Sequence, residues 1–430
     1  EETATLLNFQ LSMGQALMSE KFNLKQWLLI ALLFRLLVMP FTLHGDIFFV
    51  NIYPHFLAHG IWDAYGVGLE KNHVGYYPPL AMIFFALVQM VLGFIFPGFE
   101  EFLHSITYQS VDPLDSKQLF LALFLMKLPY LAVEFSLITI CLRMTSEDKD
   151  KRTFMVFWAV NPLVIYGTYM VGHLDLIPTF LVALACYFSL RQGEEHWACL
   201  SLAAGGLFKV FPIIFLPVVL CIASRDLKDS IRLLLYGVVP VVFVYGVFYL
   251  ISGEAVFDVF IALNHDLDAS VDFSNLFLRL CQAIVYGLVC WHILFLRQGR
   301  LDYFMLAQYF LIVYLAVYWG HLLASTHRYI WFIPFMILYV QSRPRWRKPF
   351  YLLMTIIFLA GLRSRKQTLG IFAPLNPEFF LSLPSLKDVT WFVFGPRAYD
   401  VAVAVSFKVV TAVMTLALLK KLYFPSRHEA

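Results

Sequence analysis

Apolar stretches long enough to cross a bilayer alternate with short polar loops along most of the chain. A helix needs about 20 mostly apolar residues to cross roughly 30 Å of hydrocarbon, and stretches near that length recur between positions 26 and 424. The pattern predicts an all-α, polytopic membrane helix bundle with about 10 to 13 transmembrane helices. We expect residues 1–430 to form a single transmembrane domain.

Two apolar stretches do not fit simple alternation across the membrane. Residues 79–97 lie between loops that both belong outside, which predicts a helix or hairpin in the outer leaflet. Residues 198–223 have cytoplasmic-looking loops at both ends and carry Lys209 and Pro212 near their centre, which predicts a pair of half-helices. Irregular backbone at this depth is tolerated only where protein or a cavity surrounds it. We expect Lys209 to lie on the cytoplasmic side, remote from Asp46, with a structural or local lipid-binding role.

Composition supports a membrane protein and excludes several other classes. Of 430 residues, 60% are hydrophobic and 14% charged, whereas soluble domains carry roughly a quarter charged residues. The net charge of +3 is too small and dispersed to indicate a nucleic-acid partner. The six cysteines lie in or beside apolar spans without metal-site spacing, so we interpret them as small buried hydrophobes.

Basic loops assign the two sides of the membrane. Lys and Arg in short loops mark the cytoplasmic face, and the remaining loops then lie outside. We divide the chain into an N-terminal catalytic module and a variable set of C-terminal helices. The module covers 26–222, with a first outer loop at 44–118 that we expect to hold interfacial helices, and the variable helices cover 232–424, with outer loops at 252–275, 320–329 and 363–400.

Asp46 is a carboxylate placed at the start of the first outer loop. The apolar residues after it suit a helix in the interface plane, and Asp is a good N-cap, so capping alone could explain it. A second interpretation uses its position at the outer mouth of the bundle. There a carboxylate could take the proton from an attacking hydroxyl group.

Basic residues on the same outer face are candidates for binding phosphate. His327 and Arg328 begin a late span, where a guanidinium and an imidazole can grip a phosphate group, although they could also anchor the span at the interface. Arg279 is expected about one turn inside an outer boundary, where it needs an acidic partner, a phosphate or a path for snorkelling to the interface.

Other outer-face acids admit simpler explanations. His173 and Asp175 form a further candidate pair, but Asp175 could simply cap the helix that follows it. Asp272 belongs to an acidic loop that could bind a divalent cation, although such loops are more often only solvated. Within the spans, Arg35 and Glu134 are expected to face the bundle interior, because ionisable groups are costly in lipid.

Several motifs together resemble the C-type (GT-C) membrane glycosyltransferases that use polyprenyl- or dolichyl-phosphate sugars. The resemblance is closest to the GPI first-mannosyltransferase type and its bacterial polyprenyl-phosphomannose-using relatives. The motifs are an NP-containing span, a G-x-x-D turn ending at Asp175, an F-K-x-x-P hairpin, "DFSNLF" from Asp272, and "STHRYIWFIPF". The "YYPPLA" element, with Tyr76 and Tyr77, is also similar to the dolichyl-phosphate glucosyltransferases of N-glycan precursor assembly.

The resemblance implies roles for particular residues. An Asp early in the first outer loop is the family's catalytic base, which corresponds to Asp46, and basic residues of a late outer loop contact the lipid phosphate, which corresponds to His327 and Arg328. Tyr76 and Tyr77 are added as substrate-binding candidates. The GPI type has two acids spaced D-x-D, whereas "HGDIF" offers one. A metal-clamped phosphate is therefore not favoured, and no cofactor is expected, although a divalent ion stays possible.

The sequence thus predicts an inverting hexosyltransferase, with mannose favoured, acting outside the cytoplasm. The donor would be a polyprenyl or dolichyl monophosphate sugar, and the acceptor a lipid-anchored glycan. Membrane lipids are the other expected partners. A bacterial inner membrane is favoured and an endoplasmic reticulum membrane is possible, with the site on the periplasmic or luminal side. The alternatives are a flippase or transporter of lipid-linked sugars, and a ligase or polymerase using diphosphate-linked donors.

Overall fold

The computed structural model contains helices and no strand in the part of the chain that it describes. Those residues are 23–70, 77–108, 112–257, 273–297, 301–317, 326–341, 343–362, 364–395 and 398–424. The all-α prediction is therefore confirmed for these ranges. Tyr76 and Asp272 lie outside them.

The α-helices follow one another through short connections. Those of the first part are α2 (Leu24–Val38), α3 (Asp46–Ala58), α4 (Ala64–Glu70), α5 (Pro79–Ile95), α6 (Pro97–Thr107), α7 (Leu119–Arg143), α8 (Asp148–Ala159), α9 (Pro162–Val164) and α10 (Leu176–Ser189). Those of the second part are α11 (Glu195–Phe208), α12 (Leu216–Ala223), α13 (Leu227–Ser252), α15 (Phe273–Trp291), α16 (Tyr303–Val317), α17 (Ile333–Gln341), α18 (Arg347–Gly361), α19 (Pro377–Ser382), α20 (Leu386–Phe394) and α21 (Ala398–Tyr423). Short 3₁₀ or π segments are η1 (Pro113–Asp115), η2 (Ile165–Met170), η3 (Phe211–Phe215), η4 (Gly253–Phe257), η5 (His292–Leu296), η7 (Thr326–Trp331), η8 (Pro344–Trp346), η9 (Arg365–Gln367) and η10 (Leu369–Phe372).

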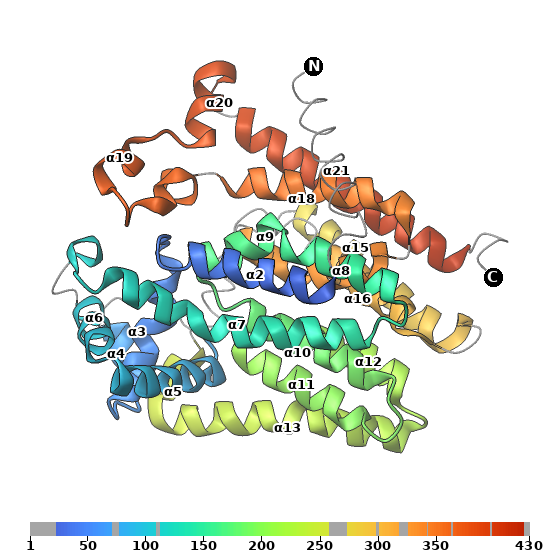
Figure 1. Ribbon diagram of the computed structural model, residues 1–430. Helices are drawn as coiled ribbons and strands as arrows, with labels where there is room; N and C mark the ends of the chain where they lie inside the picture. Colours follow the sequence, from blue (N-terminus) through green and yellow to red (C-terminus); the bar gives the residue numbers. More distant parts are fainter. Residues whose placement is uncertain are drawn as a thin grey trace.

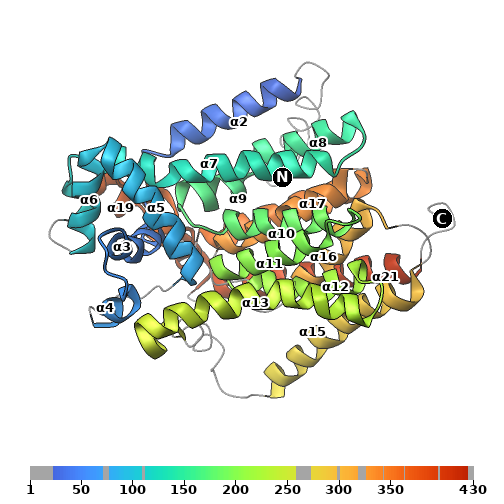
Figure 2. The ribbon, with the colours of Figure 1, turned by 90° about the horizontal axis from the view of Figure 1, so that it is seen from below.

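The helices α7, α10, α11 and α13 lie side by side and run in nearly the same line (Figures 1 and 2). The α7–α8, α10–α11 and α12–α13 connections, which the basic loops assign to the cytoplasm, meet at the right-hand end of Figure 1. Helices α3, α4, α6 and α19 lie at the opposite end, so the predicted outer segments also share one end of the bundle. We call that end, formed by α3 to α6 and the segment 364–395, the α3 end.

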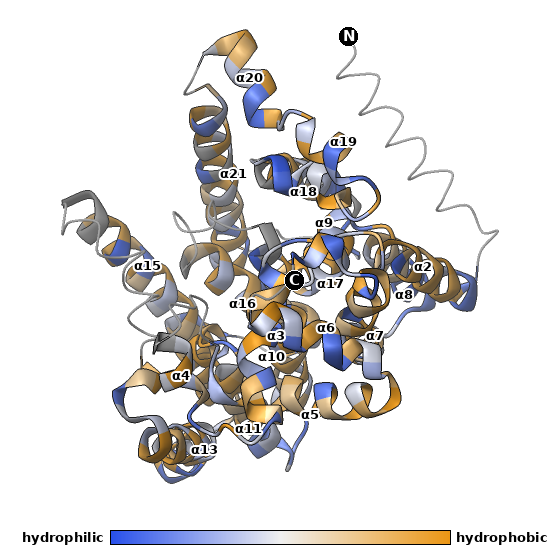
Figure 3. Ribbon diagram, turned by 90° about the vertical axis from the view of Figure 1, so that its left-hand side faces the viewer, coloured by the Kyte–Doolittle hydropathy of each residue, from blue (hydrophilic) through white to orange (hydrophobic). Residues whose placement is uncertain are grey.

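Several helices are long and apolar enough to cross a membrane. Within the described residues there are four such helices, or five if the bent pair Asp148–Ala159 and Pro162–Met170 counts as one. In the span Leu227–Phe257 the most apolar window has a mean hydropathy of 2.2, yet only 17% of it is buried. The outward faces of these helices are apolar (Figure 3), as expected for contact with lipid. The protein is an apolar helical bundle compatible with several membrane crossings.

The number of full-length crossings is smaller than the sequence predicts. Apolar helices of 10–17 residues account for part of the difference, namely Pro79–Ile95, Leu176–Ser189, Phe211–Ala223 and Tyr303–Ala316. Proline and glycine interrupt the apolar runs, and each interruption ends a helix before it reaches about 20 residues. The prediction of about 10 to 13 transmembrane helices is not confirmed.

The apolar stretch 198–223 folds back on itself, as predicted. Helix α11 ends at Phe208, Lys209 has an extended backbone with φ −162° and ψ 135°, and η3 leads into α12. A Cβ atom on Gly205 would lie 2.9 Å from Pro212, so only glycine allows the two arms this close approach. The hairpin delivers Lys209 to its own turn.

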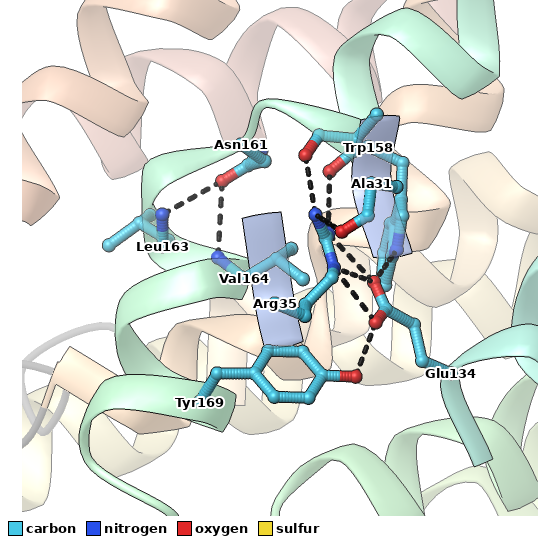
Figure 4. A network of polar contacts seen from close by, with 9 residues as sticks. Ala31, Arg35, Glu134, Trp158, Asn161, Leu163, Val164 and Tyr169 are labelled. Atoms are coloured by element: carbon cyan, nitrogen blue, oxygen red, sulfur yellow. Dashed lines mark hydrogen bonds and ion pairs between the residues drawn. The ribbon is translucent and has the colours of Figure 1, made fainter. Parts of the chain in front are cut away.

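A buried ion pair joins α2, α7, α8 and η2 in the bundle interior (Figure 4). Arg35 and Glu134 are 0% and 1% exposed, with Arg35 Nη2 2.8 Å from Glu134 Oε1. Trp158 Nε1 donates to the same carboxylate at 2.6 Å, and the Tyr169 hydroxyl donates to its other oxygen. The guanidinium also donates to the Ala159 carbonyl at 2.7 Å. This network satisfies both charges, which confirms that they face the interior and indicates a structural role.

Lys127 holds the end of α2 and the start of the first outer loop. Its ammonium is fully buried and donates to the carbonyl oxygens of Met39 at 2.8 Å and Thr42 at 2.5 Å. It also donates to the Thr42 hydroxyl at 2.9 Å. These bonds fix the backbone just before His44 and Asp46.

Candidate functional site

Asp46 is the first residue of α3 rather than its N-cap, which is Gly45. The simple capping interpretation of Asp46 is therefore wrong. Its side chain is 25% exposed and lies 3.4 Å from His44 Nδ1. The Asp46 backbone N–H donates to that same nitrogen at 3.2 Å, so Nδ1 carries no proton. Burial lowers the pKa of His44 below its ordinary value, as do His173 and Lys366, while Asp46 opposes the shift.

A tight turn before α10 brings two further polar side chains to Asp46. Gly172 has φ +76°, a backbone conformation that L side chains rarely adopt, and a Cβ atom there would lie 2.7 Å from Ile47 Cδ1. The absence of a side chain thus lets the first turn of α3 pack against this turn. Tyr130 donates to the Gly172 carbonyl at 3.1 Å and fixes it from α7. His173 and Asp175 follow directly.

Tyr77, His173 and Asp175 form a chain of polar contacts. The Tyr77 hydroxyl lies 3.0 Å from His173 Nε2, and His173 Nδ1 lies 3.1 Å from Asp175 Oδ2. Burial raises the pKa of Tyr77 well above its usual value, and Asp46 and Asp175 raise it further, whereas Arg328 lowers it. Tyr77 therefore stays protonated, and its hydroxyl lies within electrostatic range of both acids and of Arg328.

Asp175 pairs with Lys209 instead of capping α10. Its side chain makes no capping hydrogen bond, although it stands at the N-cap position, so the capping interpretation is wrong here too. Lys209 Nζ donates to Asp175 Oδ1 at 2.6 Å. Asp46 and Arg328 also act electrostatically on this ammonium. The prediction that Lys209 lies remote from Asp46 is therefore wrong.

The length of α11 explains the position of Lys209. This helix has 14 residues, which at about 1.5 Å per residue carry the chain roughly 21 Å from its first residue. The distance is a large part of the roughly 30 Å of hydrocarbon. Lys209 therefore reaches the α3 end of the bundle rather than the end where α11 begins.

Arg328 and Trp331 form the remaining wall of the site, both from η7. The Trp331 ring stacks on Phe211 with centroids 4.0 Å apart, and Lys209 Nζ lies 5.1 Å from the Trp331 centroid, within the range of a cation–π contact. Arg328 Nε is buried and makes no hydrogen bond with the described residues. A buried donor of this kind costs free energy unless it has a partner, which makes it a natural site for an anion.

A segment of the last outer loop lies against the start of α3. The Leu43 backbone N–H donates to the Ile371 carbonyl at 2.8 Å, and the Tyr166 hydroxyl donates to the Gln367 carbonyl at 2.6 Å. Lys366, in η9, acts electrostatically on His44. This segment adds a positive charge near the two acids.

The structure brings together most of the predicted site residues that it describes. Asp46, Tyr77, His173, Asp175 and Arg328 share one cluster, which we call the Asp46 cluster and which also contains His44, Lys209 and Trp331.

Two other predicted site residues are not part of this cluster in the described structure. Arg279 is exposed on α15, and no contact described for it joins it to the cluster. His327 belongs to η7, beside Arg328, but its side chain lies outside the part of the chain that the structure describes.

Lys209 and His44 are the residues that sequence reasoning dismissed or overlooked. Lys209 had a signal, because a lysine at the break of an apolar hairpin needs a carboxylate partner, and Asp175 is the acid of the preceding turn. His44 had a weaker signal, its position two residues before the candidate base.

Comparisons with models of known protein families, with curated proteins and with solved structures found no match.

Proposed function

We propose that this protein is an inverting glycosyltransferase that moves a hexose, mannose in the favoured case, from a polyprenyl or dolichyl monophosphate to a hydroxyl group of a lipid-anchored glycan. The observation that carries the proposal is the pairing of an accessible carboxylate, Asp46, with two cations, Lys209 and Arg328, at one end of an apolar bundle. The GT-C type of fold and the non-cytoplasmic side of the site are part of the same proposal.

Asp46 is the proposed general base. It is 25% exposed, so an acceptor can reach it, whereas Asp175 is 2% exposed and engaged by Lys209. Asp46 takes the proton of the acceptor hydroxyl as the oxygen attacks the anomeric carbon. The bond from that carbon to the phosphate oxygen breaks, and its electron pair leaves with the lipid phosphate. One in-line displacement inverts the anomeric centre.

Arg328 is the proposed binding group for the phosphate of the donor. The departing oxygen gains negative charge in the transition state, and fixed cations stabilise such charge most in a site shielded from water. Arg328 Nε supports this role, because it is buried without a hydrogen bond among the described residues. His327 is proposed from the sequence as its partner. No cofactor is needed for this displacement, since side-chain cations supply the charge.

The proposal is tested by product formation with purified protein. The full-length chain in lipid nanodiscs is incubated with synthetic polyprenyl-phosphate mannose, glucose or arabinose and a lipid extract as the acceptor source. Mass spectrometry then searches for an acceptor whose mass has grown by one sugar. We expect one of these donors, with mannose favoured, to give a product that is lost when no protein is added.

The same protein preparation separates the transporter alternative from the enzyme. In vesicles with labelled lipid-phosphate sugar on one leaflet, a flippase moves the label to the other leaflet without forming a glycosidic bond. Movement of this kind with no product from any donor would replace the glycosyltransferase proposal. A product only from diphosphate-linked donors would favour the ligase or polymerase.

A further inference from the structure

A second polar cluster lies at the α3 end, between α3 and α6. His55 and His59 stand four positions apart on α3, so they occupy neighbouring places on one face of that helix. Glu100 approaches them from α6, with Oε1 3.0 Å from His59 Nε2 and 3.9 Å from His55 Nδ1. One ligand atom from each residue lies within 4.8 Å of the others. None of the three belongs to the Asp46 cluster.

The ring of His55 is buried without a hydrogen bond. Its side chain is 2% exposed, and neither ring nitrogen has a hydrogen-bond partner among the described residues. Burial, followed by the neighbouring His59 and His104, lowers the pKa of His55 to about 3. The ring is therefore neutral near pH 7 and keeps a lone pair, in a place where an unpaired polar group costs free energy.

The orientation of His59 leaves a second lone pair facing the carboxylate. His59 Nδ1 lies 2.9 Å from the His55 carbonyl oxygen, and a carbonyl only accepts, so Nδ1 carries the proton. In the neutral ring Nε2 is then an acceptor, yet it lies 3.0 Å from Glu100 Oε1, which is also an acceptor. A cation between them, either a second proton or a metal ion, resolves this conflict. Such backbone-oriented histidines are typical of metal ligands.

We propose that His55, His59 and Glu100 bind a divalent transition-metal ion, with Zn²⁺ the best match to the ligand set. Two imidazoles and one carboxylate are a common zinc set, with ligand distances of about 2.0–2.2 Å. Two such ligands in a tetrahedral site lie roughly 3.4 Å apart, close to the 3.0 Å between His59 and Glu100. A small rotation of His55 brings its ring to the same ion.

The ion joins two helices and does not take part in sugar transfer. His55 stands about 13 Å along α3 from Asp46, at a rise of about 1.5 Å per residue. Glu100 lies on α6, so the ion ties α6 to the helix that begins at Asp46. The inference therefore stands independently of the proposed activity, and its tests measure metal content and thermal stability.

The experiment uses the full chain, purified in detergent with an affinity tag that contains no histidine. The protein is loaded with Zn²⁺, freed of excess metal by gel filtration and analysed for metal by mass spectrometry. His59→Ala and Glu100→Gln remove one ligand each at side chains that are 46% and 35% exposed, so both variants should fold. His196→Ala, on α11 near the opposite end of the bundle, is the matched control.

We expect about one equivalent of zinc in the wild-type protein and in His196→Ala, with at least a tenfold loss in His59→Ala and Glu100→Gln. Added Zn²⁺ should raise the thermal midpoint of the first two proteins and leave that of the ligand variants unchanged. Co²⁺ should give the visible absorption of a tetrahedral site only where zinc binds. Wild-type protein with no more metal than the double variant His59→Ala/Glu100→Gln would overturn the proposal, as would full binding by that variant.

Discussion

Lys209 Nζ lies 2.6 Å from Asp175 Oδ1, although 34 positions of the chain separate the two residues. The contact exists because α11 ends at Phe208 and the turn of its hairpin projects Lys209 toward the start of α10. Lys209 also lies over the Trp331 ring. One ammonium thereby links α10, the hairpin and η7, the three elements that surround the Asp46 cluster with α3.

Removing either member of this pair should destabilise the protein. Lys209→Met keeps the apolar stem but leaves the Asp175 carboxylate buried and uncompensated, which costs about 3–5 kcal/mol in comparable pairs. Asp175→Asn leaves the ammonium in the same position. The double variant should recover a large part of either loss in a thermal-unfolding cycle. Strictly additive losses would show that the two side chains do not interact.

The interior pair Arg35–Glu134 should be equally sensitive. Glu134→Gln leaves a fully buried guanidinium without its counter-charge, and we expect a cost of about 3–5 kcal/mol. The thermal midpoint and the yield of folded protein in detergent report the loss. Asp148→Asn is the control, because that carboxylate is 97% exposed in its pair with Lys151. Similar midpoints for the two variants would contradict the structural role of the network.

Gly172 is expected to be required for the position of Asp46. Gly172→Ala adds backbone strain at φ +76° and pushes a methyl group against Ile47, so we expect a cost above the roughly 1–3 kcal/mol of strain alone. Gly193→Ala isolates the strain, since Gly193 has φ +83° and no neighbouring atom within 4 Å. Trimming the partner in Gly172→Ala/Ile47→Ala should restore part of the stability and activity. Equal midpoints for the two glycine variants would refute the packing argument.

His44 should make the protein less stable in mild acid. Burial holds the pKa of His44 below its ordinary value of 6.5, so the unfolded chain takes up this proton first as the pH falls. The contribution of neutral His44 is present above pH 6.5 and is lost as the pH falls through the lower pKa of the folded state. Protonation at Nδ1 would also break its bond from the Asp46 N–H.

The comparison of wild type with His44→Asn isolates this effect. Asparagine can place an acceptor near Nδ1 but does not titrate. We expect the thermal midpoint of the wild type to fall more steeply than that of the variant between pH 7.5 and pH 5. Parallel profiles would mean that His44 carries no part of the acid sensitivity.

Sequence reasoning succeeded where a charge is too costly to leave in lipid. Arg35 and Glu134 could be assigned to the interior from their positions in apolar runs, because only pairing inside protein offsets their desolvation. Loop charge similarly grouped Asp46 and Arg328 on one face, and the structure brings them to one cluster. The specific pairings could not be predicted, because the partners of Arg35 and Lys209 come from distant segments.

The errors have physical causes that act above the level of a local pattern. Asp46 and Asp175 both precede helices in good capping positions, but tertiary partners determine where their side chains point. The depth of Lys209 depends on how far α11 runs before the chain turns. His55 and His59 had the i, i+4 spacing of a metal pair, but their third ligand, Glu100, is contributed by another helix.

The most direct test of the central claim is the rate of sugar transfer by Asp46→Asn compared with that of Asp63→Asn. Asp63 is an exposed acid of the same outer segment, whose carboxylate accepts a hydrogen bond from the Gly66 N–H at 3.0 Å. General-base catalysis contributes about a hundred-fold to ten-thousand-fold, so Asp46→Asn should lose that much in rate while still binding the lipid-phosphate donor. Asp63→Asn should stay close to wild type. Full activity in Asp46→Asn would contradict the assignment of Asp46 as the base.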